Sequence, residues 1–292
     1  MTASSLKAAY CTDGTKCGIT ALILCHSILL AGTATMLGSC EKRTMETIPQ
    51  GPLLKLSDAQ ASQLARKRIY FGHQSVGNNI IQGIRELVAR DSRLKLNIVR
   101  SSAPETILAP AFVESEIGQN GDPQSKDRAF RAVLDRGMGS QGGIAMYKYC
   151  YVDINATTDV PAMFASYRKS IDEIEAMYPS LKVVHITVPL TTVQTGIKAW
   201  LKQLLGRGAS EDVAAKRHEF NSLLKSTFAG KTPVFDLAEA ESTHVDGSRS
   251  YLMRGSARVY ILAPEFTDDG GHLNATGRQV VAERLLAFLA EL

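Results

Sequence analysis

The sequence predicts an α/β fold, a three-layer α/β/α sandwich around a mostly parallel sheet of five strands. Short apolar runs with strand character alternate along the chain with longer segments of helical periodicity, which is typical of a parallel sheet covered by helices. Of the 292 residues, 45% are hydrophobic and 21% are charged, as in an ordinary globular chain with a sizeable core. We therefore expect one domain over residues 55–292.

Five apolar bursts, each followed by polar or glycine-rich sequence, are the expected strands. They cover residues 68–71, 95–100, 143–149, 182–188 and 233–236. Elsewhere apolar residues recur with helical spacing, and several of these segments open with Ser, Asn or Pro. The expected helices cover residues 57–67, 78–90, 125–135, 161–178, 210–228 and 275–292. In a sheet of this kind, reactive groups gather in the loops beyond the carboxyl ends of the strands.

The N-terminal segment differs in character from the rest of the chain. Residues 18–37 are apolar and nearly uncharged, with lysines before them and charged residues soon after them. This order is typical of an export signal, and its end, Leu-Gly-Ser-Cys, matches a bacterial lipobox. We expect residues 1–39 to be removed as a signal peptide and Cys40 to carry lipid. The alternative is an uncleaved membrane anchor, because about twenty apolar residues suffice to span a bilayer.

Both alternatives place the domain outside the cytoplasm, in the cell envelope, facing the periplasm or the cell surface. With Cys40 lipidated, Cys150 is the one remaining cysteine of the mature chain, so no internal disulfide is expected.

Thr, Pro, Gln and Gly are frequent in residues 40–54, which are expected to be a tether. The net charge of +4 is spread along the chain, so nucleic acid is not an expected partner.

A carboxylate and a histidine, Asp269 and His272, stand just before the last expected helix. Two glycines separate them, which fits a tight turn that presents both side chains together. Histidine is the side chain that most readily acts as a base near neutral pH. An aspartate on its second ring nitrogen fixes the tautomer and stabilises the imidazolium. The pair is therefore a candidate for two members of a hydrolase triad.

The candidate nucleophile is Ser75, which follows the strand expected at 68–71, beyond a break at Gly72. A serine hydroxyl is a poor nucleophile and needs a base within hydrogen-bond reach, a role that we assign to His272. The simpler interpretations are a helix N-cap for Ser75 and a turn residue for Asp269.

The blocks 72–77 and 269–277 resemble the first and last motifs of the GDSL, or SGNH, hydrolases. In that family an Asp-x-x-His pair opens the C-terminal helix, often followed by Leu-Asn and then Gly, and residues 269–277 follow this order closely. The first block departs from the family. Where Gly-Asp-Ser is usual, this chain has Gly72-His73-Gln74-Ser75, with one extra residue before the serine. The resemblance implies a flavodoxin-like sheet and a serine esterase that needs no cofactor.

The resemblance also implies an oxyanion hole made by the amide of the nucleophile, a glycine after the second strand and an asparagine after the third. Gly118 is the candidate for the glycine amide. The usual Gly-x-Asn-Asp is absent, and Asn120 and Asn155 are alternatives for the side-chain donor that the sequence does not separate.

For three further polar residues we expect structural roles rather than catalytic ones. His73 is expected to be a structural histidine that hydrogen-bonds to backbone. The alternative is that it lines the substrate pocket or binds substrate. His185 lies within an expected strand and is expected in the core, and Asp236 is an expected capping residue. The sequence assigns no role to Lys148.

Together these observations predict an exported, lipid-anchored serine esterase acting on a small-molecule or carbohydrate ester, with acetylated polysaccharide as one target suggested by compartment and family. O-acyl transfer by the same residues is an alternative, and so is a non-catalytic surface lipoprotein that binds a glycan or a partner protein. No metal site is expected, because His244 and Asp246 have no second cluster with ligand spacing.

Overall fold

The computed structural model describes residues 56–193 and 210–292. The expected signal peptide 1–39, the lipidated Cys40 and the tether 40–54 lie outside these ranges and stay predictions. Within the described ranges, no helix combines the length and the apolar character that a membrane span requires.

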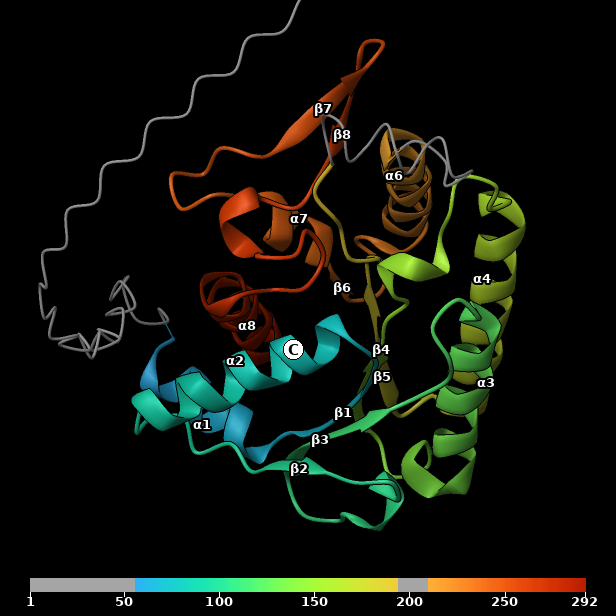
Figure 1. The fold of residues 1–292 in the computed structure, drawn as a ribbon. Coiled ribbons are helices and arrows are strands. Elements are labelled where there is room, and N and C mark those ends of the chain that lie inside the picture. Colours follow the sequence, from blue (N-terminus) through green and yellow to red (C-terminus); the bar gives the residue numbers. More distant parts are fainter. Residues whose placement is uncertain (1–55, 194–209) are drawn as a thin grey trace, which may run out of the picture. The chain divides into compact units, whose positions relative to one another are not determined.

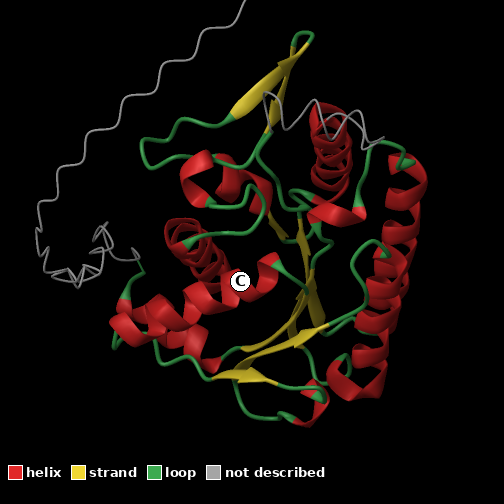
Figure 2. Ribbon diagram, in the orientation of Figure 1, coloured by secondary structure: helices red, strands yellow, loops and turns green. Residues whose placement is uncertain are grey.

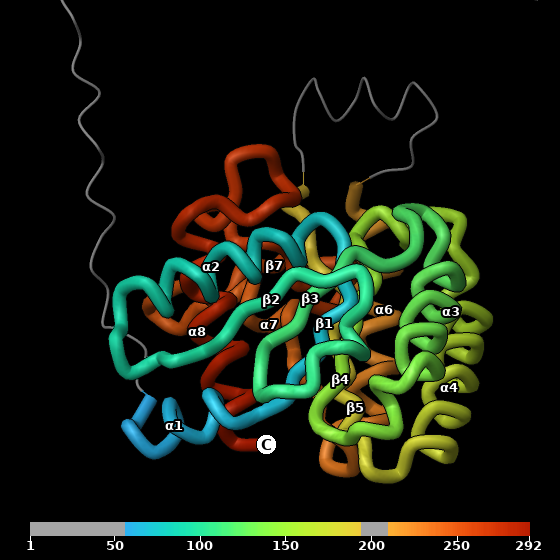
Figure 3. The backbone as a smooth tube through the Cα atoms, turned by 90° about the horizontal axis from the view of Figure 1, so that it is seen from below, coloured from blue at the N-terminus to red at the C-terminus, as the bar shows by residue number. Residues whose placement is uncertain are grey.

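A parallel sheet of six strands forms the centre of the fold, in the order β2-β3-β1-β4-β5-β6. Figure 3 labels these strands from β2 to β5. The strands are β1 (Arg68–His73), β2 (Ile98–Arg100), β3 (Ala111–Glu116), β4 (Gly143–Tyr147), β5 (Leu181–Ile186) and β6 (Val234–Phe235). After β1 the chain builds β2 and β3 on one side and then crosses to β4 on the other. The carboxyl end of β1 is therefore a topological switch point, the place where ligands bind in open α/β sheets.

Helices cover both faces of this sheet, which confirms the predicted α/β class (Figures 1 and 2). One face carries α1 (Asp58–Arg66), α2 (Val76–Arg90), α7 (Leu237–Ser242) and α8 (Ala275–Glu291). The other carries α3 (Pro123–Val133), α4 (Val160–Met177) and α6 (Ser210–Phe228). Successive strand residues point to opposite faces. Phe71 accordingly packs in the first core and its neighbour Tyr70 in the second.

Strand β3 is not among the five predicted strands, and it is the reason why the sheet has six. Its sequence contains Glu114 and Glu116, and carboxylates are uncommon in strands. Glu114 is nonetheless buried because its carboxylate has two partners. The Nε2 atom of His73, on the neighbouring strand β1, lies 3.0 Å from Oε2, and the guanidinium of Arg85 on α2 lies 3.6 Å from Oε1. Only the folded chain reveals these partners.

Shorter elements complete the described chain and were not predicted either. A two-stranded antiparallel hairpin is formed by β7 (Tyr251–Arg254) and β8 (Ala257–Tyr260). Single turns of 3-10 helix occur at Pro104–Thr106, Tyr151–Asp153 and Pro264–Phe266, and a π-helical turn occurs at Leu134–Met138.

Helix α7 carries a carboxyl group in the core. Glu241 is fully buried, its Oε2 atom accepts a hydrogen bond of 2.6 Å from the Leu190 amide, and Oε1 has no partner among the described residues. Burial raises the pKa of Glu241 from 4.5 to about 8, although the Leu190 amide and the nearby Lys148 and Arg217 act in the opposite direction. The folded protein therefore keeps a proton here that the unfolded chain releases.

We expect this proton to make the protein less stable as the pH rises from about 4.5 to about 8, the interval between the two pKa values. Within that interval the folded state binds more protons than the unfolded state, so the free energy of unfolding falls with pH. Glu241→Gln should remove this contribution, and urea unfolding at pH 5, 6, 7 and 8 measures it. The stability of Glu241→Gln relative to wild type should grow with pH, whereas that of the exposed Glu239→Gln on the same helix should not. Parallel pH profiles for all three proteins would show that Glu241 is ionised in the fold.

Candidate active site

Ser75 sits in a sharp turn between β1 and α2. Its φ is 51° and its ψ is −106°, and no other non-glycine residue of the described ranges has a positive φ. Such a backbone costs about 1–3 kcal/mol and persists only where its surroundings enforce it. Ser75 occupies the N-cap position of α2, but its side chain makes no capping hydrogen bond to the helix. The turn instead directs the hydroxyl away from the helix.

The hydroxyl of Ser75 meets the imidazole of His272, which lies 197 residues away in sequence. The Ser75 Oγ atom is 2.6 Å from Nε2 of His272, and Nδ1 of His272 is 2.6 Å from Oδ2 of Asp269. The three residues singled out in the sequence therefore lie in one hydrogen-bonded row. The His272 side chain is 44% exposed, so solvent and ligands have access to this row.

The Asp269 carboxylate is held by the turn in which it lies. Its Oδ1 atom accepts hydrogen bonds of 2.8 Å from the amides of Gly271 and His272. Partial burial acts to raise the pKa of Asp269, but the hydrogen bonds from the His272 ring and from these two amides outweigh it and keep the pKa well below its usual range. The Asp269 carboxylate is therefore ionised at neutral pH.

Gly118 lies in the loop after β3, on one side of Ser75. Its φ is +62°, and a Cβ atom at this position would stand 2.6 Å from the backbone nitrogen of Lys126, so only glycine fits. The side chain of Gln74, next to Ser75, donates a hydrogen bond of 3.2 Å to the Gly118 carbonyl. This bond ties the Gly118 loop to the turn that carries the serine.

Lys148, to which the sequence assigns no role, forms a hydrogen bond to the backbone of that turn. It is 1% exposed, and its Nζ atom donates a hydrogen bond of 3.0 Å to the Gln74 carbonyl. This carbonyl shares a peptide unit with the Ser75 amide, and in a trans peptide the two groups point in opposite directions. A hydrogen-bond donor on the carbonyl therefore both orients and polarises the Ser75 N–H. Burial lowers the pKa of Lys148, which favours the neutral amine, and the amine donates this hydrogen bond as well.

A buried ion pair joins the loops on the two sides of Ser75. The Nζ atom of Lys126 lies 2.7 Å from Oδ2 of Asp153, and both side chains are fully buried. Asp153 also accepts hydrogen bonds from the amides of Gly121 (2.7 Å) and Cys150 (2.6 Å). The loop after β3 is thus fastened to the turn after β4.

The structure brings neither predicted asparagine into a hydrogen bond with Ser75 or His272. Asn155 is exposed, and its Oδ1 atom accepts hydrogen bonds from the amide and hydroxyl of Thr157. Asn120 is also exposed, in the turn that follows Gly118. The side chain that approaches from the 150–155 segment is Tyr151, whose Oη atom lies 3.4 Å from Nε2 of His272. The tyrosine is visible in the sequence of this segment, but the family pattern points to asparagine there.

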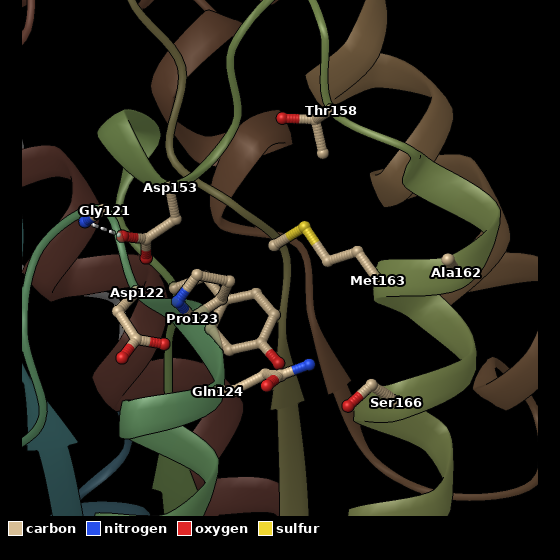
Figure 4. A pocket seen from close by; sticks show the side chains of 10 residues that line it. Gly121, Asp122, Pro123, Gln124, Asp153, Thr158, Ala162, Met163 and Ser166 are labelled. Atoms are coloured by element: carbon tan, nitrogen blue, oxygen red, sulfur yellow. Dashed lines mark hydrogen bonds between the residues drawn. The ribbon is translucent and has the colours of Figure 1, made fainter.

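A pocket of about 360 Å³ lies between the first turns of α3 and α4 (Figure 4). Figure 4 shows the hydrogen bond from the Gly121 amide to Asp153 at its edge, so the pocket adjoins the loop that carries Gly118. Its walls are neutral and acidic, with Gln124, Thr158 and Ser166 among the polar groups. A pocket therefore lies at the same edge of the sheet as the hydrogen-bonded loops around Ser75.

Within residues 56–193 and 210–292, no three His, Cys, Asp or Glu side chains are grouped as metal ligands would be. His244 pairs through Nδ1 with Glu265 and through Nε2 with Ser250, while Asp246 accepts hydrogen bonds from Ser248. Cys150 is a buried free thiol.

No family model and no curated protein matches this chain. Among solved structures, a protein of the G-D-S-L family from Desulfitobacterium hafniense DCB-2 is 9% identical, with a TM-score of 0.43 over 76% of this chain and 99% of that chain. An acetyl xylan esterase is 13% identical, with a TM-score of 0.42 over 75% of this chain and 98% of that chain. A carbohydrate acetylesterase from Sinorhizobium meliloti is 11% identical, with a TM-score of 0.41 over 77% of this chain and 99% of that chain. Likenesses this distant leave the activity to be inferred from the site itself.

We expect the ion pair between Lys126 and Asp153 to be essential to the fold. Asp153→Ala leaves a buried ammonium without its partner and should lower the free energy of unfolding by about 3–5 kcal/mol. Asp172→Ala is the matched control, because Asp172 pairs with Arg168 and both side chains are more than half exposed. Its effect should stay within about 1 kcal/mol. Urea denaturation measures both, and equal effects would contradict the role of the buried pair.

Proposed function

We propose that this protein is a serine esterase in which Ser75 is the nucleophile, His272 the general base and Asp269 the residue that orients the imidazole. The observation that carries the proposal is the row of two 2.6 Å contacts, from the Ser75 hydroxyl to His272 and from His272 to Asp269. A nucleophile within reach of a base that is itself held by a third group is the arrangement that activates serine. The strained turn at Ser75, which leaves its hydroxyl free of the helix, supports the same role.

The reaction proceeds in two halves. The Ser75 oxygen attacks the ester carbonyl carbon while His272 takes the hydroxyl proton, and His272 then gives this proton to the departing alcohol as the bond between the carbonyl carbon and the alcohol oxygen breaks. Water, losing a proton to His272, attacks the acyl-enzyme and releases the acid, and Ser75 regains its proton. In each half the amides of Ser75 and Gly118 donate to the carbonyl oxygen as it becomes negative.

The proposed substrate is an ester of a small molecule or of a carbohydrate. Half-exposed side chains at His272 and Asp269 allow an ester group to reach Ser75 while the rest of a larger substrate stays in solvent. Ser75 and His272 do not line the pocket between α3 and α4, but its edge at Gly121 belongs to the loop that carries Gly118, and its neutral and acidic polar groups are suited to a hydroxyl-rich part of a larger substrate.

Labelling with a fluorophosphonate and hydrolysis of a short-chain aryl ester test the proposal. Ser75→Ala should abolish labelling and lower the rate by on the order of 10⁵-fold, and His272→Ala should do almost as much. The double variant should lose no more than Ser75→Ala alone, because the two residues act as a unit. The exposed Ser226→Ala should behave as wild type.

Two outcomes would contradict the proposal. Labelling that persists in Ser75→Ala would place the nucleophile elsewhere. A wild-type protein that neither labels nor hydrolyses esters would favour a binding protein.

We also propose that the domain is exported and anchored by lipid at Cys40, on the basis of the sequence of residues 1–40. In a bacterial host supplied with radiolabelled palmitate, the wild-type chain should carry label and sediment with membranes. Cys40→Ala should lose the label, whereas Ser39→Ala, which keeps a small residue before the cysteine, should retain it. Label that survives in Cys40→Ala would exclude this residue as the lipid site.

A further inference from the structure

The turn after β4 places one hydroxyl group at the proposed reaction centre. Tyr151 Oη lies 3.4 Å from the same His272 nitrogen that faces Ser75, and the nearby Ser75 side chain acts to lower the pKa of Tyr151. The tyrosine ring meets the His272 ring edge to face, with 5.7 Å between their centres.

The order of the strands puts Tyr151 opposite Gly118. Strand β1, which leads to Ser75, lies between β3, which leads to Gly118, and β4, which leads to Tyr151. An acyl group attached to the Ser75 oxygen would therefore lie between the Gly118 loop and the tyrosine hydroxyl.

Two residues fix the position of Tyr151. Arg217 is 6% exposed and donates a hydrogen bond of 3.0 Å through Nε to the Tyr151 carbonyl, with its guanidinium 5.8 Å from the ring centre. On the other side, a Cβ atom at Gly271 would stand 3.0 Å from the Tyr151 hydroxyl. Glycine at position 271, inside the Asp-Gly-Gly-His turn, thus leaves the space that the phenol occupies.

The hydroxyl is suited to donate rather than to accept. Burial raises the pKa of Tyr151, and the negative charge of Asp269 raises it further, although the contact with Ser75 opposes both. The phenol therefore keeps its proton at neutral pH and, once a substrate is bound, can offer it to an oxygen that gains negative charge.

We propose that Tyr151 is a catalytic residue whose hydroxyl donates a hydrogen bond to the ester carbonyl oxygen as it becomes an oxyanion. This inference rests on the proposed esterase function, and it assigns to tyrosine the side-chain donor sought at Asn120 and Asn155. No covalent bond to Tyr151 forms or breaks, because the hydroxyl keeps its proton throughout.

Tyr151→Phe tests the proposal because it removes one oxygen and keeps the ring against Gly271 and Arg217. With an aryl acetate, kcat should fall by about 10²-fold or more, the usual effect of losing one oxyanion donor, while KM changes little. Tyr251→Phe on the β7–β8 hairpin is the matched control and should leave kcat unchanged. Wild-type kcat in Tyr151→Phe would overturn the proposal.

A second measurement separates oxyanion donation from any effect on folding. The rate on the aryl ester is divided by the rate on its thionoester, in which sulfur, a weaker hydrogen-bond acceptor, replaces the carbonyl oxygen. This ratio does not depend on how much of the protein is folded. It should be smaller in Tyr151→Phe than in wild type, because the variant has lost a donor that discriminates between oxygen and sulfur. An unchanged ratio would show that Tyr151 does not contact the oxyanion.

Fluorophosphonate labelling distinguishes this failure from a failure of the esterase function. If Tyr151→Phe keeps wild-type kcat and an unchanged ratio while Ser75→Ala still loses labelling and turnover, the proposal for Tyr151 fails and the serine mechanism stands.

Discussion

The buried ion pair between Lys126 and Asp153 is the interaction on which the geometry of the site depends. A buried charge is tolerated only when it is paired and its remaining hydrogen-bonding capacity is filled. Here the Gly121 and Cys150 amides and the Gln119 carbonyl complete the pair. The backbone of Lys126 also packs so closely against Gly118 that only glycine fits there. One residue therefore contacts the Gly118 loop after β3 and, through Asp153, the turn after β4.

The unusual residues before the serine have structural partners of their own. His73 was expected to hydrogen-bond to backbone, but its ring instead faces the carboxylate of Glu114 on β3. Gln74 holds the Gly118 carbonyl with its side chain and receives Lys148 on its own carbonyl. The residues that depart from the Gly-Asp-Ser pattern thus connect the serine turn to both neighbouring strands.

The features that could be predicted from sequence are those whose signals are local. Apolar periodicity predicted the layers, and the Asp-x-x-His turn could be recognised because both residues belong to one turn. His185 and Asp236 were also placed correctly, in the core and at the cap of α7. In contrast, β3 depends on the pairing of Glu114 with His73, and the position of Tyr151 depends on how β4 lies beside β1. Such partners are set by tertiary contacts that no short window of sequence contains.

The backbone conformation of Ser75 sets the proposed chemistry against the stability of the fold. A residue without a Cβ atom would occupy this turn without the steric strain that serine bears there, so glycine at position 75 would relieve that part of the cost. A redesign that selects variants only for relief of backbone strain would favour this exchange and would remove the hydroxyl of the proposed nucleophile.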